Sequence, residues 1–205
     1  MLYGVLRILF SILMFIVVII LTGALKYNKK KFIIILTSIF SIVLCTVSYL
    51  FPIENIFINF KTPEKVFKYS NVGEIEDVIC GNDSCMIVSS TKEYSYAYTF
   101  VLKSSKGYKI GSSFSYEEIA NRIKGSKNLT LFKVKDTKDY YVFGYFTADG
   151  KELNISDNIG SEFKSIIVGE KSSSRNTYIT YAFIDDIKEE YYITIDDEEL
   201  ILDIY

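Results

Sequence analysis

The 205-residue chain contains no histidine and no tryptophan, and it has only three cysteines and two prolines. Without histidine it cannot build a Ser-His-Asp or Cys-His catalytic group, and it lacks the side chain that most often binds transition metals. The sequence also contains no phosphate-binding loop and no dinucleotide fingerprint. We therefore predict no catalytic residue, no cofactor and no metal site.

Acidic residues are missing from the first 51 positions, which hold five basic residues. Residues 52–205 hold 18 basic and all 25 acidic residues, a formal charge of −7. A chain with this balance has no electrostatic attraction for nucleic acid, so we predict no nucleic-acid partner. The contrast predicts two parts, residues 1–51 and a domain of residues 52–205 that is large enough for its own core.

Two long apolar runs, residues 8–25 and 32–51, flank a basic segment at 26–31. Each run has about the length that crosses a ~30 Å hydrocarbon core as a helix. The runs predict a transmembrane hairpin over residues 1–51, with the lipid bilayer as a partner. The lysines between the runs favour a cytoplasmic loop. This predicts a multi-pass protein of the cell membrane with two helices, both termini and the second domain lying outside the cytoplasm.

Two other interpretations of this region remain open. Residues 1–24 could be a signal peptide that is cleaved after small residues, with residues 32–51 stopping transfer and the domain left in the cytoplasm. The hairpin could also lie in the membrane with the opposite orientation. The position of the lysines favours the hairpin with a cytoplasmic loop over the signal peptide and over the inverted hairpin.

Small side chains recur in the second apolar run at Ser38, Ser41, Cys45 and Ser48. Their 3-4-3 spacing places them on one face of a helix. Small and hydroxylated residues let helices approach closely, which favours packing against the first helix. The alternative is a docking face for another membrane or envelope protein.

After residue 52 the sequence predicts a mainly-β, antiparallel domain (β-rich α+β) with two short helices. Thr62, Pro63 and Glu64 are typical of a helix start, and the helix is expected to end near Tyr69. The second helix is expected to begin at the capping box of residues 115–118 and to stop at Gly125. Strands are predicted at 74–80, 85–90, 94–102, 108–110, 129–135, 140–147, 163–168, 177–184, 190–195 and 199–204.

Two turns are expected to close hairpins. Residues 81–84 form a turn quartet between the first two strands, and Asp149-Gly150 favours a tight turn into a return strand at 151–155. Cys80 and Cys85 flank the first turn, where facing strand residues can meet disulfide geometry. We predict a structural disulfide between them, with two free thiols as the alternative.

Aromatic and small residues alternate from Tyr94 through Tyr96 and Tyr98. Such a stripe is most often the core face of a strand. Its alternative is a binding face on which a glycan or peptide stacks. Acidic residues near the carboxyl end lack the spacing of a calcium loop, and nothing in the sequence singles out a pair of carboxylates for glycoside hydrolysis.

The segments 51–57, 62–69 and 107–110 resemble uncharacterised membrane-anchored proteins of Gram-positive bacteria. Those proteins pair apolar amino-terminal helices with a β-rich external domain. The resemblance implies a bacterial membrane protein with no assigned activity, and it transfers no catalytic residue.

The sequence therefore predicts a membrane-anchored, extracytoplasmic binding or interaction protein without enzymatic activity. One alternative is an accessory or sensory subunit of a membrane complex that docks through its second helix. The other is a carboxylate-based hydrolase of envelope polymers.

Overall fold

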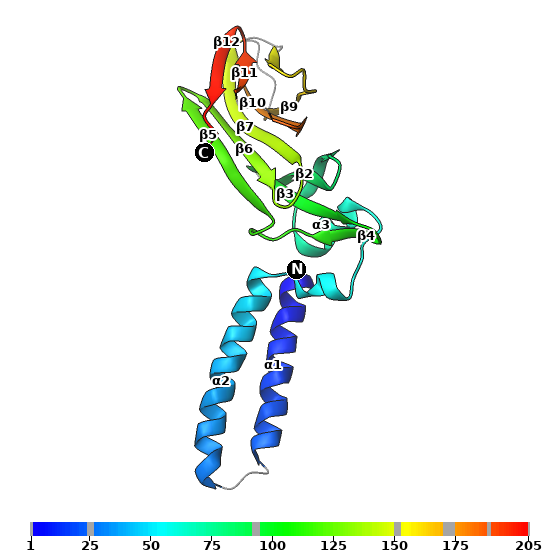
Figure 1. Ribbon diagram of the computed structural model, residues 1–205, viewed down its shortest axis with the longest axis vertical. Helices are drawn as coiled ribbons and strands as arrows, with labels where there is room; N and C mark the ends of the chain where they lie inside the picture. Colours follow the sequence, from blue (N-terminus) through cyan, green and yellow to red (C-terminus); the bar gives the residue numbers. More distant parts are fainter. Residues whose placement is uncertain are drawn as a thin grey trace.

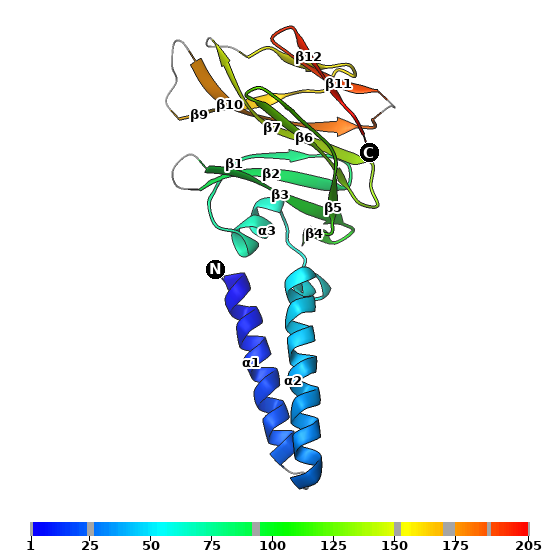
Figure 2. The ribbon, with the colours of Figure 1, turned by 90° about the vertical axis from the view of Figure 1, so that its left-hand side faces the viewer.

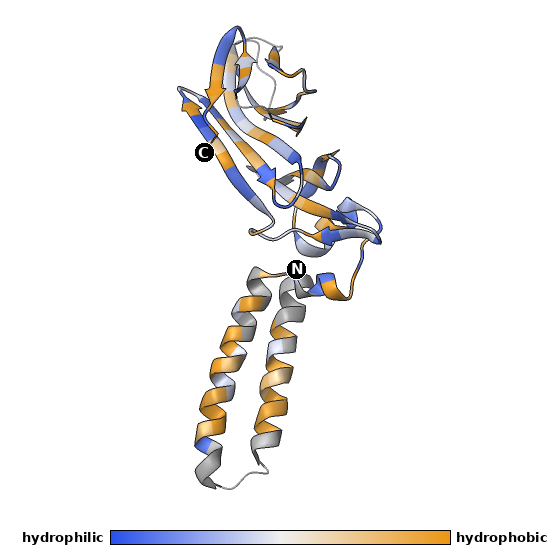
Figure 3. Ribbon diagram, viewed as in Figure 1, coloured by the Kyte–Doolittle hydropathy of each residue, from blue (hydrophilic) through white to orange (hydrophobic). Residues whose placement is uncertain are grey.

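The computed structural model describes residues 2–23, 27–91, 95–149, 153–169, 175–187 and 190–204. Two helices, α1 (Leu2–Gly23) and α2 (Tyr27–Leu50), lie side by side at one end of the molecule, and the strands lie at the other (Figure 1). Figure 3 shows that most of the described residues of both helices are hydrophobic. Many of their large apolar side chains are exposed, including Ile20 at 68% and Phe32 at 70%.

The predicted transmembrane hairpin is contradicted. Within the described residues, no helix is long and apolar enough to cross a membrane. The sequence prediction placed Lys29, Lys30 and Lys31 in a loop, whereas α2 begins at Tyr27 and includes all three. These three lysines thus lie in the first turns of α2, which the sequence prediction had assigned to the connecting loop. The predicted membrane localisation, with two spans and both termini outside the cytoplasm, depended on these helices and is overturned with them.

The half-buried positions of α1 and α2 recur at helical spacing, which marks the seam between the two helices. Within 8–20 and 31–43 the described half-buried residues are Ser11, Met14 and Val18 on α1, and Ile33, Thr37, Ser38 and Ser41 on α2. Ser38 and Ser41 therefore lie on the seam, which favours helix packing as the reason for the small residues. The side chains of Cys45 and Ser48 fall outside the described residues.

A short connection links α2 to the strands. It contains the 3₁₀ helix η1 (Ile53–Ile56) and α3 (Pro63–Ser70). Thr62 precedes α3 in an extended conformation and Pro63 takes its first position, so the predicted first short helix is confirmed. Val66 and Phe67 are buried and pack in one cluster with apolar side chains of the first sheet.

The first sheet, here called sheet A, has the antiparallel order β1-β2-β3-β4. Its strands are β1 (Glu74–Cys80), β2 (Ser84–Thr91), β3 (Ser95–Ser104) and β4 (Gly107–Ile110). Consecutive strands are neighbours, as the turn residues of the sequence predict. The hairpin around residues 81–84 is confirmed, with Cys80 opposite Cys85 in the register.

The second sheet, sheet B, has the order β5-β6-β7-β10-β9. Its strands are β5 (Tyr116–Lys124), β6 (Lys127–Val134), β7 (Asp139–Asp149), β9 (Lys164–Val168) and β10 (Arg175–Asp185). The second predicted helix is wrong, because its residues form β5. Gly125, at φ 61°, belongs to the β5–β6 turn and does not end a helix. Pairing of β5 along β6 outweighs the local capping signal of residues 115–118.

The third sheet, sheet C, has the order β12-β11-β8 and contains β8 (Ile155–Asp157), β11 (Tyr191–Ile195) and β12 (Glu198–Leu202). Within the described residues the hairpin expected at Asp149-Gly150 is not present, and β7 pairs with β6 and β10. Of the described residues of the return strand predicted at 151–155, only Ile155 lies in a strand, β8, which pairs with β11. Gly150 itself lies outside the described residues.

Figure 2 shows α3, sheet A, sheet B and sheet C as successive layers. The period-two alternation of sheet B serves both of its neighbours. In β7, Tyr141 and Phe143 pack in the cluster shared with sheet A, whereas Val142 and Phe146 pack in the cluster shared with sheet C. Sheet B is thus the central layer of the domain, and its side chains line the interfaces with both sheet A and sheet C.

Candidate functional site

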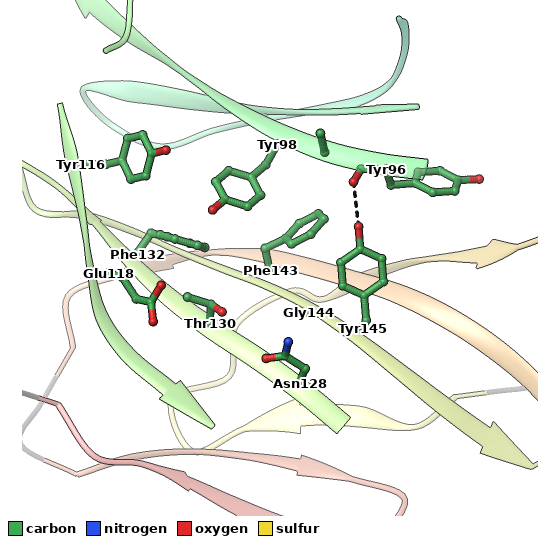
Figure 4. Close-up of a pocket in the computed structure, with 11 residues that line it drawn as sticks. Tyr96, Tyr98, Tyr116, Glu118, Asn128, Thr130, Phe132, Phe143, Gly144 and Tyr145 are labelled. Carbon is green, nitrogen blue, oxygen red and sulfur yellow. Dashed lines mark hydrogen bonds between the residues drawn. The ribbon is translucent and has the colours of Figure 1, made fainter. Parts of the chain in front are cut away.

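A cavity of about 420 Å³ opens between sheets A and B, where β3 meets β5, β6 and β7 (Figure 4). We call it the aromatic pocket. Its lining residues are Tyr96, Ala97, Tyr98, Tyr116, Glu118, Asn128, Thr130, Phe132, Phe143, Gly144 and Tyr145. They come from four strands of two sheets, so the site depends on how the sheets stack.

Aromatic rings from both sheets line the pocket. The alternation of β3 points Tyr96 and Tyr98 toward sheet B, and both are half-buried. The Tyr98 ring centroid lies 4.7 Å from that of Phe132 and 5.0 Å from that of Phe143, with Tyr116 edge-on at 6.3 Å. These separations are those of favourable ring packing, so the wall is held in place by its own contacts.

Polar side chains share the sheet B wall with the rings of Phe132 and Phe143. Glu118 of β5 is the cross-strand neighbour of Phe132, and Thr130 and Asn128 continue the same face of β6 (Figure 4). Asn121 donates a hydrogen bond from Nδ2 to Thr130 Oγ1 at 2.9 Å. Glu118 is the one charged residue among the described residues that line the pocket. A ligand there meets both rings and hydrogen-bonding groups on sheet B, and the rings of Tyr96 and Tyr98 on sheet A.

Three tyrosine hydroxyls of the pocket have a raised pKa. Burial, together with the neighbouring Tyr116 and Glu118, raises the pKa of Tyr98 to about 12. Burial also raises the pKa of Tyr116 and of Tyr145. Tyr145 donates its hydroxyl proton to the carbonyl oxygen of Tyr96 at 2.7 Å, which joins β7 to β3 across the pocket.

The described lining residues supply groups for stacking and hydrogen bonding together with one carboxylate. Glycoside hydrolysis needs two carboxylates flanking the scissile bond. Within the described residues, no group of three or more cysteine, aspartate or glutamate side chains is placed to hold a metal ion.

Two residues of the predicted aromatic stripe, Tyr96 and Tyr98, line the pocket and also pack against the core between sheets A and B. The alternative that the stripe is a binding face stays a prediction, and Tyr94 lies outside the described residues. Tyr116 and Glu118 were missed as site residues, because the helix predicted there would not place them beside β3. Their two-residue spacing was the available signal.

Cys80 and Cys85 are joined by a disulfide, with their Cα atoms 4.0 Å apart. The bond closes the turn between β1 and β2. Cys85 is completely buried, whereas Cys80 lies at an exposed position of β1. This disulfide is outside the aromatic pocket, which fits a structural role.

A buried carboxylate that the sequence did not reveal holds the same turn against sheet B. Asp139, at the start of β7, is completely buried. It accepts hydrogen bonds from Asn82 N at 3.0 Å, from Asp83 N at 2.8 Å and from Ser84 Oγ at 2.6 Å. We call this set of contacts the Asp139 anchor. It fixes one end of sheet A on sheet B.

Comparisons of this chain with protein-family models, with curated proteins and with solved structures find no match. The resemblance to membrane-anchored bacterial proteins therefore stays a prediction. The function has to be argued from the pocket itself.

Proposed function

We propose that the protein is a non-enzymatic binding protein whose aromatic pocket holds a small amphipathic ligand. The observation that supports this is the mixed lining, in which the rings of Tyr98, Phe132 and Phe143 lie beside the polar side chains of Glu118, Asn128 and Thr130. A volume of about 420 Å³ falls within the range of small-molecule sites, which typically combine apolar walls with a few placed polar groups.

Rigidity of the walls also supports binding. Sheets A and B are joined beside the pocket by the Tyr145–Tyr96 hydrogen bond, and elsewhere by the ion pair of Lys164 with Asp77 at 2.8 Å and by the Asp139 anchor. A site on strands that are fixed in this way loses little conformational freedom when a ligand enters. The pocket is therefore organised before the ligand arrives.

The test is to fill the pocket. The full chain would be purified in a non-ionic detergent, because the exposed apolar side chains of α1 and α2 promote association in water. Ligand-observed NMR with a library of small polar aromatic and aliphatic compounds would identify binders. Asn128→Trp places a large ring at an exposed lining position and should abolish their binding.

The matched control is Lys138→Trp, which adds the same ring at an exposed turn position outside the pocket. It should leave binding unchanged. Compounds that bind the Asn128→Trp protein as well as the unmodified chain would refute the proposed function.

A further inference from the structure

The charge of the pocket limits the ligand. Glu118 is the one charged side chain among the described lining residues, and residues 52–205 carry a formal charge of −7. An anionic ligand would be repelled both by this carboxylate and by the field of the whole domain. The charge of the pocket and of the domain therefore favours neutral and cationic ligands over anionic ones.

The rings favour the cation. The face of an aromatic ring carries negative charge density and attracts a cation within about 6 Å of its centroid. Tyr98, Tyr116, Phe132 and Phe143 surround the same cavity and contact one another at centroid separations of 4.7 to 6.3 Å. Glu118 is the cross-strand neighbour of Phe132 on sheet B, so that a positive group beside this ring would also lie near a carboxylate (Figure 4).

The lining also distinguishes between kinds of cation. A primary ammonium group has three N–H donors, each of which needs an acceptor when it leaves water. Six of the eleven lining residues are aromatic, so that ring faces outnumber the side-chain acceptors of Glu118, Asn128 and Thr130, and Thr130 Oγ1 already accepts a hydrogen bond from Asn121. A methylated ammonium group carries its charge without requiring hydrogen bonds, and its methyl groups can contact the rings directly.

We propose that the aromatic pocket selects a small organic cation that carries a methylated ammonium group. The cation lies against the rings of Tyr98 and Phe132, and Glu118 balances its charge. This inference rests on the proposed binding function and adds the chemical class of the ligand.

The experiment compares two probes of the same shape, choline and 3,3-dimethylbutan-1-ol, which differ in having nitrogen or carbon at the branched centre. Binding of each to the full chain in non-ionic detergent would be measured by titration calorimetry or NMR. Choline should bind at least about tenfold more tightly than the neutral alcohol. Glu118→Gln should remove most of that difference.

Glu117→Gln is the matched control, because it removes the same charge from the neighbouring position of β5, where Glu117 lies near Lys135 and outside the pocket lining. It should leave choline affinity unchanged. A circular dichroism spectrum of each variant verifies that the fold is retained.

The outcomes separate the two proposals. Equal affinity for the two probes would overturn the cation inference while leaving the binding function in place. An equal loss of choline affinity in Glu118→Gln and Glu117→Gln would assign the effect to net charge and would also overturn it. If choline fails to bind and the compound library also yields no binder that Asn128→Trp excludes, the proposed function fails as well.

Discussion

Replacing Asp139 by asparagine tests whether the Asp139 anchor holds sheet A on sheet B. Three donors, Asn82 N, Asp83 N and Ser84 Oγ, converge on the two carboxylate oxygens of this completely buried side chain. Asparagine has nearly the same shape but only one oxygen. Its amide nitrogen would have to point toward at least one of these donors, and the negative charge that strengthens all three hydrogen bonds would be gone.

The expected cost follows from these contacts. A hydrogen bond to a charged group contributes about 1.5–3 kcal/mol, and a buried donor left without an acceptor costs about 1–3 kcal/mol. With one donor unsatisfied and the other bonds weakened, Asp139→Asn should lower the free energy of unfolding by about 3 kcal/mol. Ser84 Oγ also lies 3.0 Å from the Tyr141 hydroxyl, which limits the loss at that donor.

Urea unfolding followed by tyrosine fluorescence would measure this change, since the chain has no tryptophan. Asp185→Asn is the matched control. Asp185 accepts a hydrogen bond from Asn82 Nδ2 at 3.2 Å on the same turn but is exposed, so its replacement should cost under about 1 kcal/mol. Similar losses in the two variants would refute the reasoning that burial makes Asp139 the anchor.

Three further predictions concern stability. Cys80→Ser with Cys85→Ser should lower the free energy of unfolding by about 2 kcal/mol, measured as the urea midpoint, because the disulfide closes a short loop; no change would mean that the bond does not constrain the unfolded chain. Gly144→Ala should lower the free energy of unfolding by about 1–3 kcal/mol, since the added Cβ would lie 2.4 Å from Leu129 Cδ2 and 2.6 Å from Asn128 O. Gly160→Ala is the comparison for backbone strain without a clash, because its Cβ would meet nothing within 4 Å while φ is 79°. Burial raises the pKa of Tyr98 to about 12 and also raises the pKa of Tyr141 and Tyr191. Unfolded tyrosine ionises near pH 10, so the folded state retains protons that the unfolded state loses, and this stability is complete below about pH 10 and declines as the pH rises toward about 12. Urea unfolding at intervals across that range would measure the decline, and a flat profile would contradict it.

The strands of sheet A were predictable because their signals are local. The turn residues at 81–84 and 106–107 separate alternating segments, and each strand pairs with its neighbour in the sequence. The Cys80–Cys85 pairing follows from the same hairpin register. In sheet A, turn chemistry and alternation together are therefore sufficient to predict the pairing.

Two predictions outside sheet A were wrong. The capping box at 115–118 is a valid local helix signal, but β5 forms a hairpin with its sequence neighbour β6, and the ladder between the two strands outweighs that signal. Similarly, Asp149-Gly150 favours a tight turn, yet β7 pairs along its whole length with β10, some thirty residues later. Local preference contributes about 1 kcal/mol, whereas a paired and buried strand contributes several times more.

The position of the pocket follows from a change of composition along one face of β6. Reading back from Val134, the residues of that face are Phe132, Thr130 and Asn128, and they change from buried and apolar to half-buried and exposed. Val134 and Phe132 pack in the core that sheet B shares with sheet A, whereas Thr130 and Asn128 line the pocket. One alternating strand therefore supplies the end of the core and the beginning of the site. The alternation of β6 can be read from the sequence. It locates the pocket only when β3 is known to be the strand that lies across this face.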